Sequence, residues 1–151
     1  MSESTLIQYI RDPSNLDATE VQSGLSLFTL QDEVWIKLDA GTRAHMLVVN
    51  KSEVPMEKIL SNILLVSRAR PVVIQSLFPA LDGRGPSESE IEQYAERLVE
   101  LKSAGAQISL VQIYSATRPT VNPQCGHLPL RTLSRIAQVV RKRTGLNTEI
   151  F

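Results

Sequence analysis

The sequence is poor in cysteine and has no excess of charge of either sign. Its single cysteine, Cys125, excludes an internal disulfide framework and a metal centre built only from cysteines of this chain. Lys+Arg and Asp+Glu number 16 each, so the charge balance favours neither nucleic acid nor an anionic membrane as a partner. No apolar run is long enough to span a bilayer, and the N-terminus lacks a basic-then-apolar targeting pattern. These absences predict a soluble cytoplasmic protein.

Several stretches have the alternation of apolar residues that is typical of strands. In Glu33–Gly41 every second residue from Val34 to Leu38 is a branched aliphatic residue, and a glycine ends the run. Alternating patterns recur in Val72–Phe78 and Ile108–Ser115. Two shorter candidates, at residues 6–10 and 148–151, lie near the two ends of the sequence.

Helical periodicity separates these strands. Helices are predicted from about residue 17 to 28, 55 to 70, 87 to 104 and 129 to 144. Ser87 and Glu90 have capping-box spacing, and Gly105 and Gly145 suit helix ends. Residues 42–54 lack a clean period, so we expect a loop with at most one helical turn there.

The alternation of strands and helices predicts an α/β fold. We expect one domain over residues 1–151, with about four parallel strands and a helix after each. These would form an arc of an incomplete (β/α) barrel with the helices on its outer face. An arc has two exposed edges and an uncovered inner face, which predicts a partner, self-association or poor stability.

Polar residues gather toward the carboxyl ends of the predicted strands, where parallel α/β folds place ligand sites. They are Lys37, Asp39, Gln75, Gln112 and Tyr114. Lys37 and Asp39 would be either a ligand-facing pair or a structural ion pair. Each of the others, taken singly, is better explained by a hydrogen bond to backbone or water, but jointly they outline a polar-lined cavity. If the pair is buried, Lys37→Ala should cost on the order of 3–5 kcal/mol by stranding a charge.

Other motifs favour structural interpretations. His45 and His127 lie in predicted loops, and Cys125-Gly126-His127 is not a metal-site spacing by itself. Asp82–Gly85 contains two glycines before a capped helix, yet it matches no phosphate-binding pattern, so a plain loop is the better interpretation. The basic residues of the last helix fit a solvated helix end.

Four segments resemble a known family, the radical S-adenosylmethionine (radical SAM) enzymes. They are Asp32–Thr42 (DEVWIKLDAGT), Pro71–Phe78 (PVVIQSLF), Ser87–Tyr94 (SESEIEQY) and Val111–Pro119 (VQIYSATRP). The resemblance covers nearly the whole chain, and it corresponds to the second half of the family's partial barrel, with the strand near residue 6 as the family's third. It implies that Lys37, Asp39, Gln75, Gln112 and Tyr114 occupy positions that face cofactor or substrate in the family.

The family's reactive centre is missing from the sequence. Complete members bind S-adenosylmethionine and a [4Fe–4S] cluster held by Cys-x-x-x-Cys-x-x-Cys, which this chain lacks together with the family's Gly-Gly-Glu-like motif. The resemblance therefore implies a truncated or cluster-less relative, with no cofactor expected for this chain alone and an N-terminal half supplied in trans. The alternatives are a non-enzymatic binding module that uses the open barrel face and, less favoured, an independent α/β enzyme with Lys37 and Asp39 as an acid–base pair.

Overall fold

Five strands of the chain form one parallel sheet. The structure is a computed structural model, and it describes residues 7–10, 18–29, 32–50, 54–115 and 125–151. The sheet has the order β1-β2-β3-β5-β7, and every neighbouring pair is parallel. Its strands are β1 (Ile7–Ile10), β2 (Glu33–Lys37), β3 (Val72–Leu77), β5 (Ile108–Tyr114) and β7 (Thr148–Ile150). The predicted parallel α/β architecture is confirmed, with five strands instead of about four, because the short stretch at residues 148–151 contributes β7.

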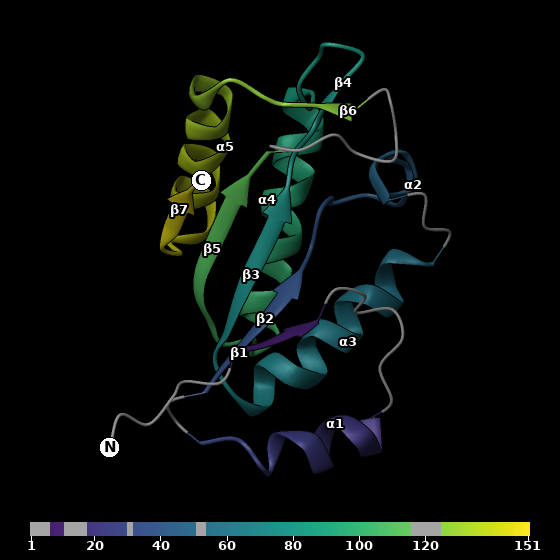
Figure 1. Cartoon of the computed structure of the whole chain (residues 1–151), viewed down its shortest axis with the longest axis vertical. Coiled ribbons are helices and arrows are strands. Elements are labelled where there is room, and N and C mark those ends of the chain that lie inside the picture. The colour runs from purple at the N-terminus through teal and green to yellow at the C-terminus, as the bar shows by residue number, and fades with distance from the viewer. Residues whose placement is uncertain (1–6, 11–17, 30–31, 51–53, 116–124) are drawn as a thin grey trace.

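Helices alternate with these strands along the chain (Figure 1). They are α1 (Ala18–Leu25), α2 (Arg43–Asn50), α3 (Met56–Ala69), α4 (Glu88–Ser103) and α5 (Leu130–Thr144). Two short strands, β4 (Ala80–Leu81) and β6 (Cys125–Gly126), pair antiparallel as a separate ribbon. Among the described residues, no helix is long and apolar enough to cross a membrane.

The two faces of the sheet differ, as the alternation in the sequence predicts. Val34 and Ile36 of β2 and Ile74 of β3 are almost completely buried in the main hydrophobic core. Ser76 of β3 contacts Tyr94 of α4, so this is the face that the helices cover. In Figure 1, α4 lies behind β3 and β5, and the opposite face of these strands is turned to the viewer. We call that opposite side the inner face.

The helix α4 begins and ends where the sequence predicts. The Ser87 hydroxyl accepts a hydrogen bond from the Glu90 backbone N–H at 3.1 Å, which caps the first turn. At the other end Gly105 has φ +100°, and the next N–H, of Ala106, donates to the carbonyl of Leu101 at 2.9 Å. A side chain at Gly105 would strain this left-handed turn, so glycine is needed there.

The prediction of a loop with at most one helical turn at residues 42–54 is wrong for the stretch that forms α2. The Thr42 hydroxyl accepts from the His45 backbone N–H at 3.1 Å and caps this eight-residue helix. Its buried side chains are a histidine and a methionine, His45 and Met46, whereas Leu47 and Val48 are exposed. Because the apolar residues do not mark the buried face, hydrophobic periodicity gives no signal for this helix.

The stretch Asp82–Gly85 contains a tight hairpin turn. Asp82 and Gly83 both have positive φ, and Leu81 and Arg84 exchange two backbone hydrogen bonds of 2.8 and 3.0 Å. Positive φ at both central residues is the geometry of a two-residue type I′ turn, for which Asp-Gly is a preferred pair. The geometry agrees with the plain-loop interpretation of this stretch.

Candidate functional site

Three of the predicted site residues form a row across the inner face. Lys37 of β2 lies opposite Gln75 of β3 in the strand register, and Gln75 lies opposite Gln112 of β5. The Gln75 Nε2 donates to Gln112 Oε1 at 3.3 Å. We call Lys37, Gln75 and Gln112 the polar row. Parallel pairing in this register places the three side chains at one height on one face of the sheet.

Tyr114 lies beside the polar row. It follows Gln112 by two residues on β5, so its side chain is on the same face. The Lys37 ammonium lies 5.7 Å from the centroid of the Tyr114 ring, a distance at which a cation–π attraction acts. The structure thus brings four of the five predicted site residues together near the carboxyl ends of their strands.

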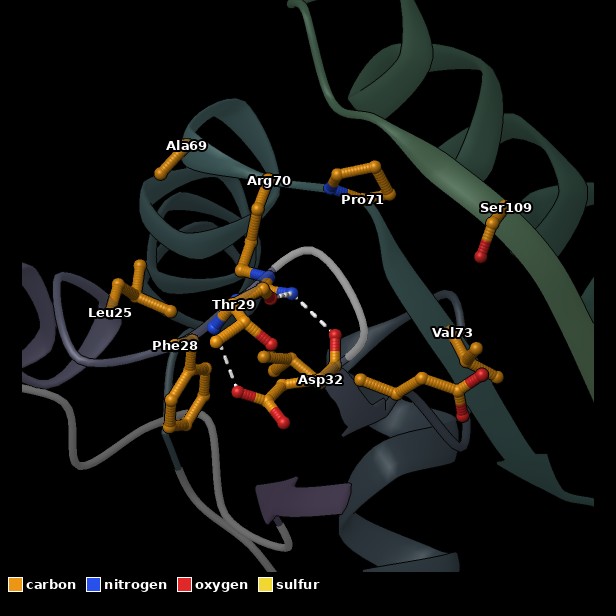
Figure 2. A pocket seen from close by; sticks show the side chains of 11 residues that line it. Leu25, Phe28, Thr29, Asp32, Ala69, Arg70, Pro71, Val73 and Ser109 are labelled. Carbon is orange, nitrogen blue, oxygen red and sulfur yellow. Dashed lines mark hydrogen bonds between the residues drawn. The ribbon is translucent and has the colours of Figure 1, made fainter. Parts of the chain in front are cut away.

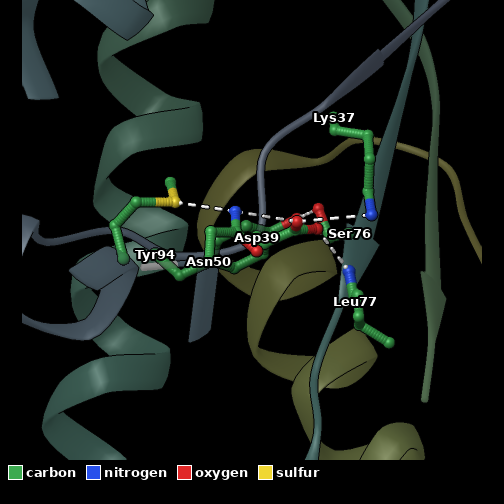
Figure 3. Close-up of polar contacts among 7 residues, drawn as sticks. Lys37, Asp39, Asn50, Ser76, Leu77 and Tyr94 are labelled. Carbon is green, nitrogen blue, oxygen red and sulfur yellow. Dashed lines mark hydrogen bonds and ion pairs between the residues drawn. The ribbon is translucent and has the colours of Figure 1, made fainter. Parts of the chain in front are cut away.

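Asp39, the fifth predicted residue, is held by the protein itself (Figure 3). Only 2% of its surface is exposed. Its Oδ1 accepts from the Leu77 backbone N–H at 2.8 Å, and its Oδ2 accepts from Asn50 Nδ2 at 3.1 Å. The Lys37 ammonium lies 3.4 Å from the same Oδ2. Of the two interpretations weighed for the pair, this geometry matches a structural ion pair for Asp39.

Lys37 differs from Asp39 because its side chain is 21% exposed. Burial by itself lowers the pKa of Lys37, but the Asp39 carboxylate and the Tyr114 hydroxyl outweigh that effect and raise the pKa. Lys37 is therefore cationic at neutral pH. It offers the inner face a positive charge next to two amides and a phenol.

Gln75 carries an acceptor without a partner. Its Oε1 is buried and makes no hydrogen bond, while its Nε2 donates to Gln112. An unsatisfied buried carbonyl costs about 1–3 kcal/mol. The polar row therefore contains one acceptor that the described residues leave without a donor.

Behind Asp39, two hydroxyls join β3 to α4. The Ser76 and Tyr94 hydroxyls lie 2.5 Å apart, and Tyr94 is completely buried with its ring edge-on to Phe78. Burial is the main cause that raises the pKa of Tyr94, so its phenol stays neutral. Both side chains lie on the helix-covered side of the sheet, where their contact fixes the end of β3 against α4.

His45 forms a second polar contact, which the sequence does not reveal. Its Nε2 lies 3.1 Å from the Glu90 carboxylate of α4, and its Nδ1 is buried without a partner. Burial lowers the pKa of His45, and the carboxylates of Glu90 and Asp39 offset only part of this effect. We assign a neutral imidazole that donates from Nε2 to Glu90. The only signal in the sequence is Thr42 three residues earlier, which favours a helix start.

A cavity of about 580 Å³ lies at the opposite, amino end of the strands (Figure 2). Arg70, which follows α3, reaches into it and donates through Nη2 to the backbone carbonyls of Thr29 and Asp32. The guanidinium also lies 5.3 Å from the Phe28 ring centroid. These contacts tie the segment before β2 to the end of α3, so Arg70 acts as a structural clip.

The remaining candidate motifs do not join the polar row. His127 is exposed, and Cys125 lies in β6. Within the part of the chain that the structure describes, no group of three or more His, Cys, Asp or Glu residues is placed to hold a metal ion. Arg135 pairs with Glu88 at 2.8 Å, and Arg143 pairs with Glu92 and Glu96. Part of the basic cluster of the last helix therefore connects α5 to α4 at the surface.

Comparison with known proteins reveals a likeness in structure. No family model matches the sequence, and no curated protein matches it. Among solved structures, a radical SAM methyltransferase from Sphaerobacter thermophilus superimposes with a TM-score of 0.67 and 18% sequence identity. The alignment covers 95% of this chain and 39% of that chain, so this chain spans well under half the length of the enzyme. At this identity the likeness concerns the fold alone, and the fold of this chain is radical SAM-like.

Proposed function

We propose that this chain is a cluster-less, radical SAM-like half-barrel that does not cleave S-adenosylmethionine by itself. The observation that carries the proposal is the polar row on the inner face of a sheet with this fold, in a chain with one cysteine. A [4Fe–4S] cluster held in the manner of the family needs three thiolates, and Cys125 supplies at most one. The residues present therefore do not fit the cluster.

Any radical chemistry then requires thiolates from outside these 151 residues. We propose that an N-terminal half-barrel supplies them. The outer edge of β1 supports this, because β1 pairs with β2 on one side only in the five-stranded sheet. A parallel strand from a partner would satisfy this edge and extend the inner face past Lys37.

The proposal is tested by anaerobic reconstitution with iron and sulfide. For this chain alone we expect no stoichiometric cluster and no 5′-deoxyadenosine from S-adenosylmethionine. One cluster per chain would contradict the proposal. If the DNA upstream of Met1 encodes a Cys-x-x-x-Cys-x-x-Cys segment, the polypeptide that contains this segment is the candidate partner for co-expression. Co-expression of the two polypeptides should then give a complex that binds a cluster, and two chains that purify separately would count against assembly in trans.

The second candidate is a non-enzymatic module that binds a small molecule on the inner face. The unpartnered Oε1 of Gln75, a residue opposite Lys37 in the strand register, favours it. S-adenosylmethionine is a suitable probe, because its carboxylate and amino groups complement a cation and an acceptor. Saturable binding that Gln75→Leu weakens, and that Gln138→Leu on the exposed surface of α5 leaves unchanged, would support this candidate. Equal binding by both variants would exclude the polar row as the site.

A further inference from the structure

The tight turn that follows β4 carries an Asp-Gly pair at its tip. Asp82 and Gly83 are its two central residues, and both are exposed. They form the only Asp-Gly pair in the sequence, which contains no Asn-Gly pair. In Figure 1 this turn lies beyond the carboxyl ends of β3 and β5. Neither residue belongs to the polar row, so the turn is a separate feature of the molecule.

The side chain of Asp82 is not fixed by neighbours. Within the part of the chain that the structure describes, no hydrogen bond or ion pair engages its carboxylate. Asp39 is the contrast, because its carboxylate is buried and accepts hydrogen bonds from Leu77 and Asn50. An exposed carboxyl without such partners samples the staggered rotamers that turn it toward the next peptide nitrogen.

The backbone nitrogen of Gly83 is also accessible. The hydrogen bonds that close the turn use the N–H groups of Leu81 and Arg84, not that of Gly83. Gly83 has no side chain to shield its nitrogen, and a Cβ built there would meet no atom within 4 Å apart from its chain neighbours. This nitrogen is thus neither hydrogen-bonded in the turn nor covered by its own residue.

We propose that Asp82 is a site of spontaneous isomerisation to isoaspartate. The Gly83 nitrogen attacks Cγ of the neutral Asp82 carboxyl, so an N–Cγ bond forms and the Cγ–OH bond breaks. The proton of the nitrogen leaves with the hydroxyl as water, and a five-membered imide remains. Water then opens this ring. Opening at Cγ restores aspartate, whereas opening at the main-chain carbonyl leaves the chain linked through Cγ, with a free α-carboxylate. No electrons are transferred and the mass is unchanged.

The product changes the geometry of the turn, because isoaspartate adds one methylene group to the main chain. The two hydrogen bonds between Leu81 and Arg84 depend on a two-residue turn, so a longer chain disrupts them. Directly beside the turn, β4 pairs with β6, with Leu81 opposite Cys125. We therefore expect isomerisation to loosen the β4–β6 ribbon and to leave the five-stranded sheet in place.

The test incubates the full chain in warm, mildly acidic buffer, where more carboxyl groups are neutral, and follows Asp82 by peptide mapping over time. We expect a second peptide of identical mass and different retention, whose fragmentation assigns isoaspartate to Asp82. An isoaspartate-specific protein methyltransferase, used as a reagent, should label the same peptide. Asp32 and Asp39, whose carboxylates accept hydrogen bonds from the backbone, are internal controls and should stay unmodified.

The variant Gly83→Asn assigns the reaction to this nitrogen. Asparagine tolerates a positive φ, so the turn is kept, but its side chain shields the attacking nitrogen. Isomerisation at Asp82 should therefore slow several-fold. A urea-unfolded sample of the wild-type chain shows that the assay detects the product. An unchanged Asp82 peptide in the folded chain while the unfolded chain isomerises, or equal rates for the wild type and the Gly83→Asn variant, would overturn the proposal.

Discussion

At the scale of single residues, Asp39 is a buried polar group that three contacts hold at the strand ends. Its carboxylate receives hydrogen bonds from the Leu77 backbone and from Asn50, and it faces the Lys37 ammonium. Lys37 is partly exposed, so water can solvate its ammonium if the carboxylate of Asp39 is removed. This solvation offsets part of the electrostatic free energy that the ammonium would lose. The two members of this ion pair therefore contribute unequally to stability.

This asymmetry gives a prediction for two alanine variants. Asp39→Ala should cost about 3–5 kcal/mol of unfolding free energy, because it strands the Leu77 N–H and a half-buried ammonium. Lys37→Ala should cost only about 1–3 kcal/mol, less than full burial of the pair would give, because two donors to Asp39 remain. Urea denaturation of both variants measures the difference, with Lys58→Ala, at an exposed site on α3, as the control. A cost for Lys37→Ala equal to that for Asp39→Ala would contradict this account.

The sequence predicts where the polar residues at the strand ends lie better than it predicts their hydrogen-bond partners. Alternation along a strand fixes which residues share a face, and parallel pairing brings strand ends together, so the polar row follows from periodicity. The partners of Asp39 do not follow, because Leu77 and Asn50 are 38 and 11 residues away. Contacts of that kind depend on the path of the chain after β2. That path leads into α2, whose apolar residues have no helical period that a sequence pattern could reveal.

At the scale of elements, Gly41 sets how closely the end of β2 approaches α4. A Cβ built at Gly41 would lie 2.3 Å from the backbone nitrogen of Tyr94. Since the obstacle is helix backbone and not a flexible side chain, no rotamer change can relieve the clash. The chain can leave β2 and pass over α4 toward α2 only with glycine at this position.

Gly41→Ala should therefore destabilise the protein by about 1–3 kcal/mol or more, as overpacking of a tight contact does. The matched control is Gly24→Ala in α1, where a Cβ meets no atom within 4 Å. That substitution should be neutral or stabilising by up to about 1 kcal/mol, because alanine favours helix over glycine. Thermal unfolding of the two variants makes the comparison, and similar midpoints for both would refute the proposed role of Gly41.

Elements with strong local signals were predicted correctly. Three signals of α4 act through near neighbours in the sequence, so a short stretch of sequence is enough to predict them. They are the Ser87 cap, the glycine after the helix and the apolar stripe along it. The helix α2 was missed because its stability comes from the burial of His45 against α4, a contact with Glu90 that is distant in the chain. Tertiary burial overrides weak helical propensity in such segments.

At the scale of the whole molecule, His45 couples global stability to pH. The pKa of its imidazole is lowered in the folded state, so the unfolded chain binds the proton first as the pH falls. The stability that neutral His45 provides is thus complete above the unfolded pKa, near 6.5, and is lost as the pH falls below it toward the folded pKa.

Replacement of His45 should make stability less sensitive to acid. Between about pH 7 and pH 5, His45→Gln should lose less unfolding free energy than the wild-type protein, because glutamine has no proton to gain. Chemical denaturation at several pH values measures this slope. His127→Gln, at an exposed position, is the control and should follow the wild-type slope. A steeper slope for His45→Gln would mean that Glu90 stabilises a charged imidazole.

The succession of strands in the sheet has a consequence for how the protein is assembled. Each strand of the five-stranded sheet pairs with the strand of that sheet that comes next in the sequence. Such a sheet can form by the addition of one strand and its helix at a time. No later strand has to insert between two strands that have already paired. A polypeptide of this kind can be interrupted between successive units and reassembled from its pieces, since a break there removes a covalent link and leaves the order of the sheet intact.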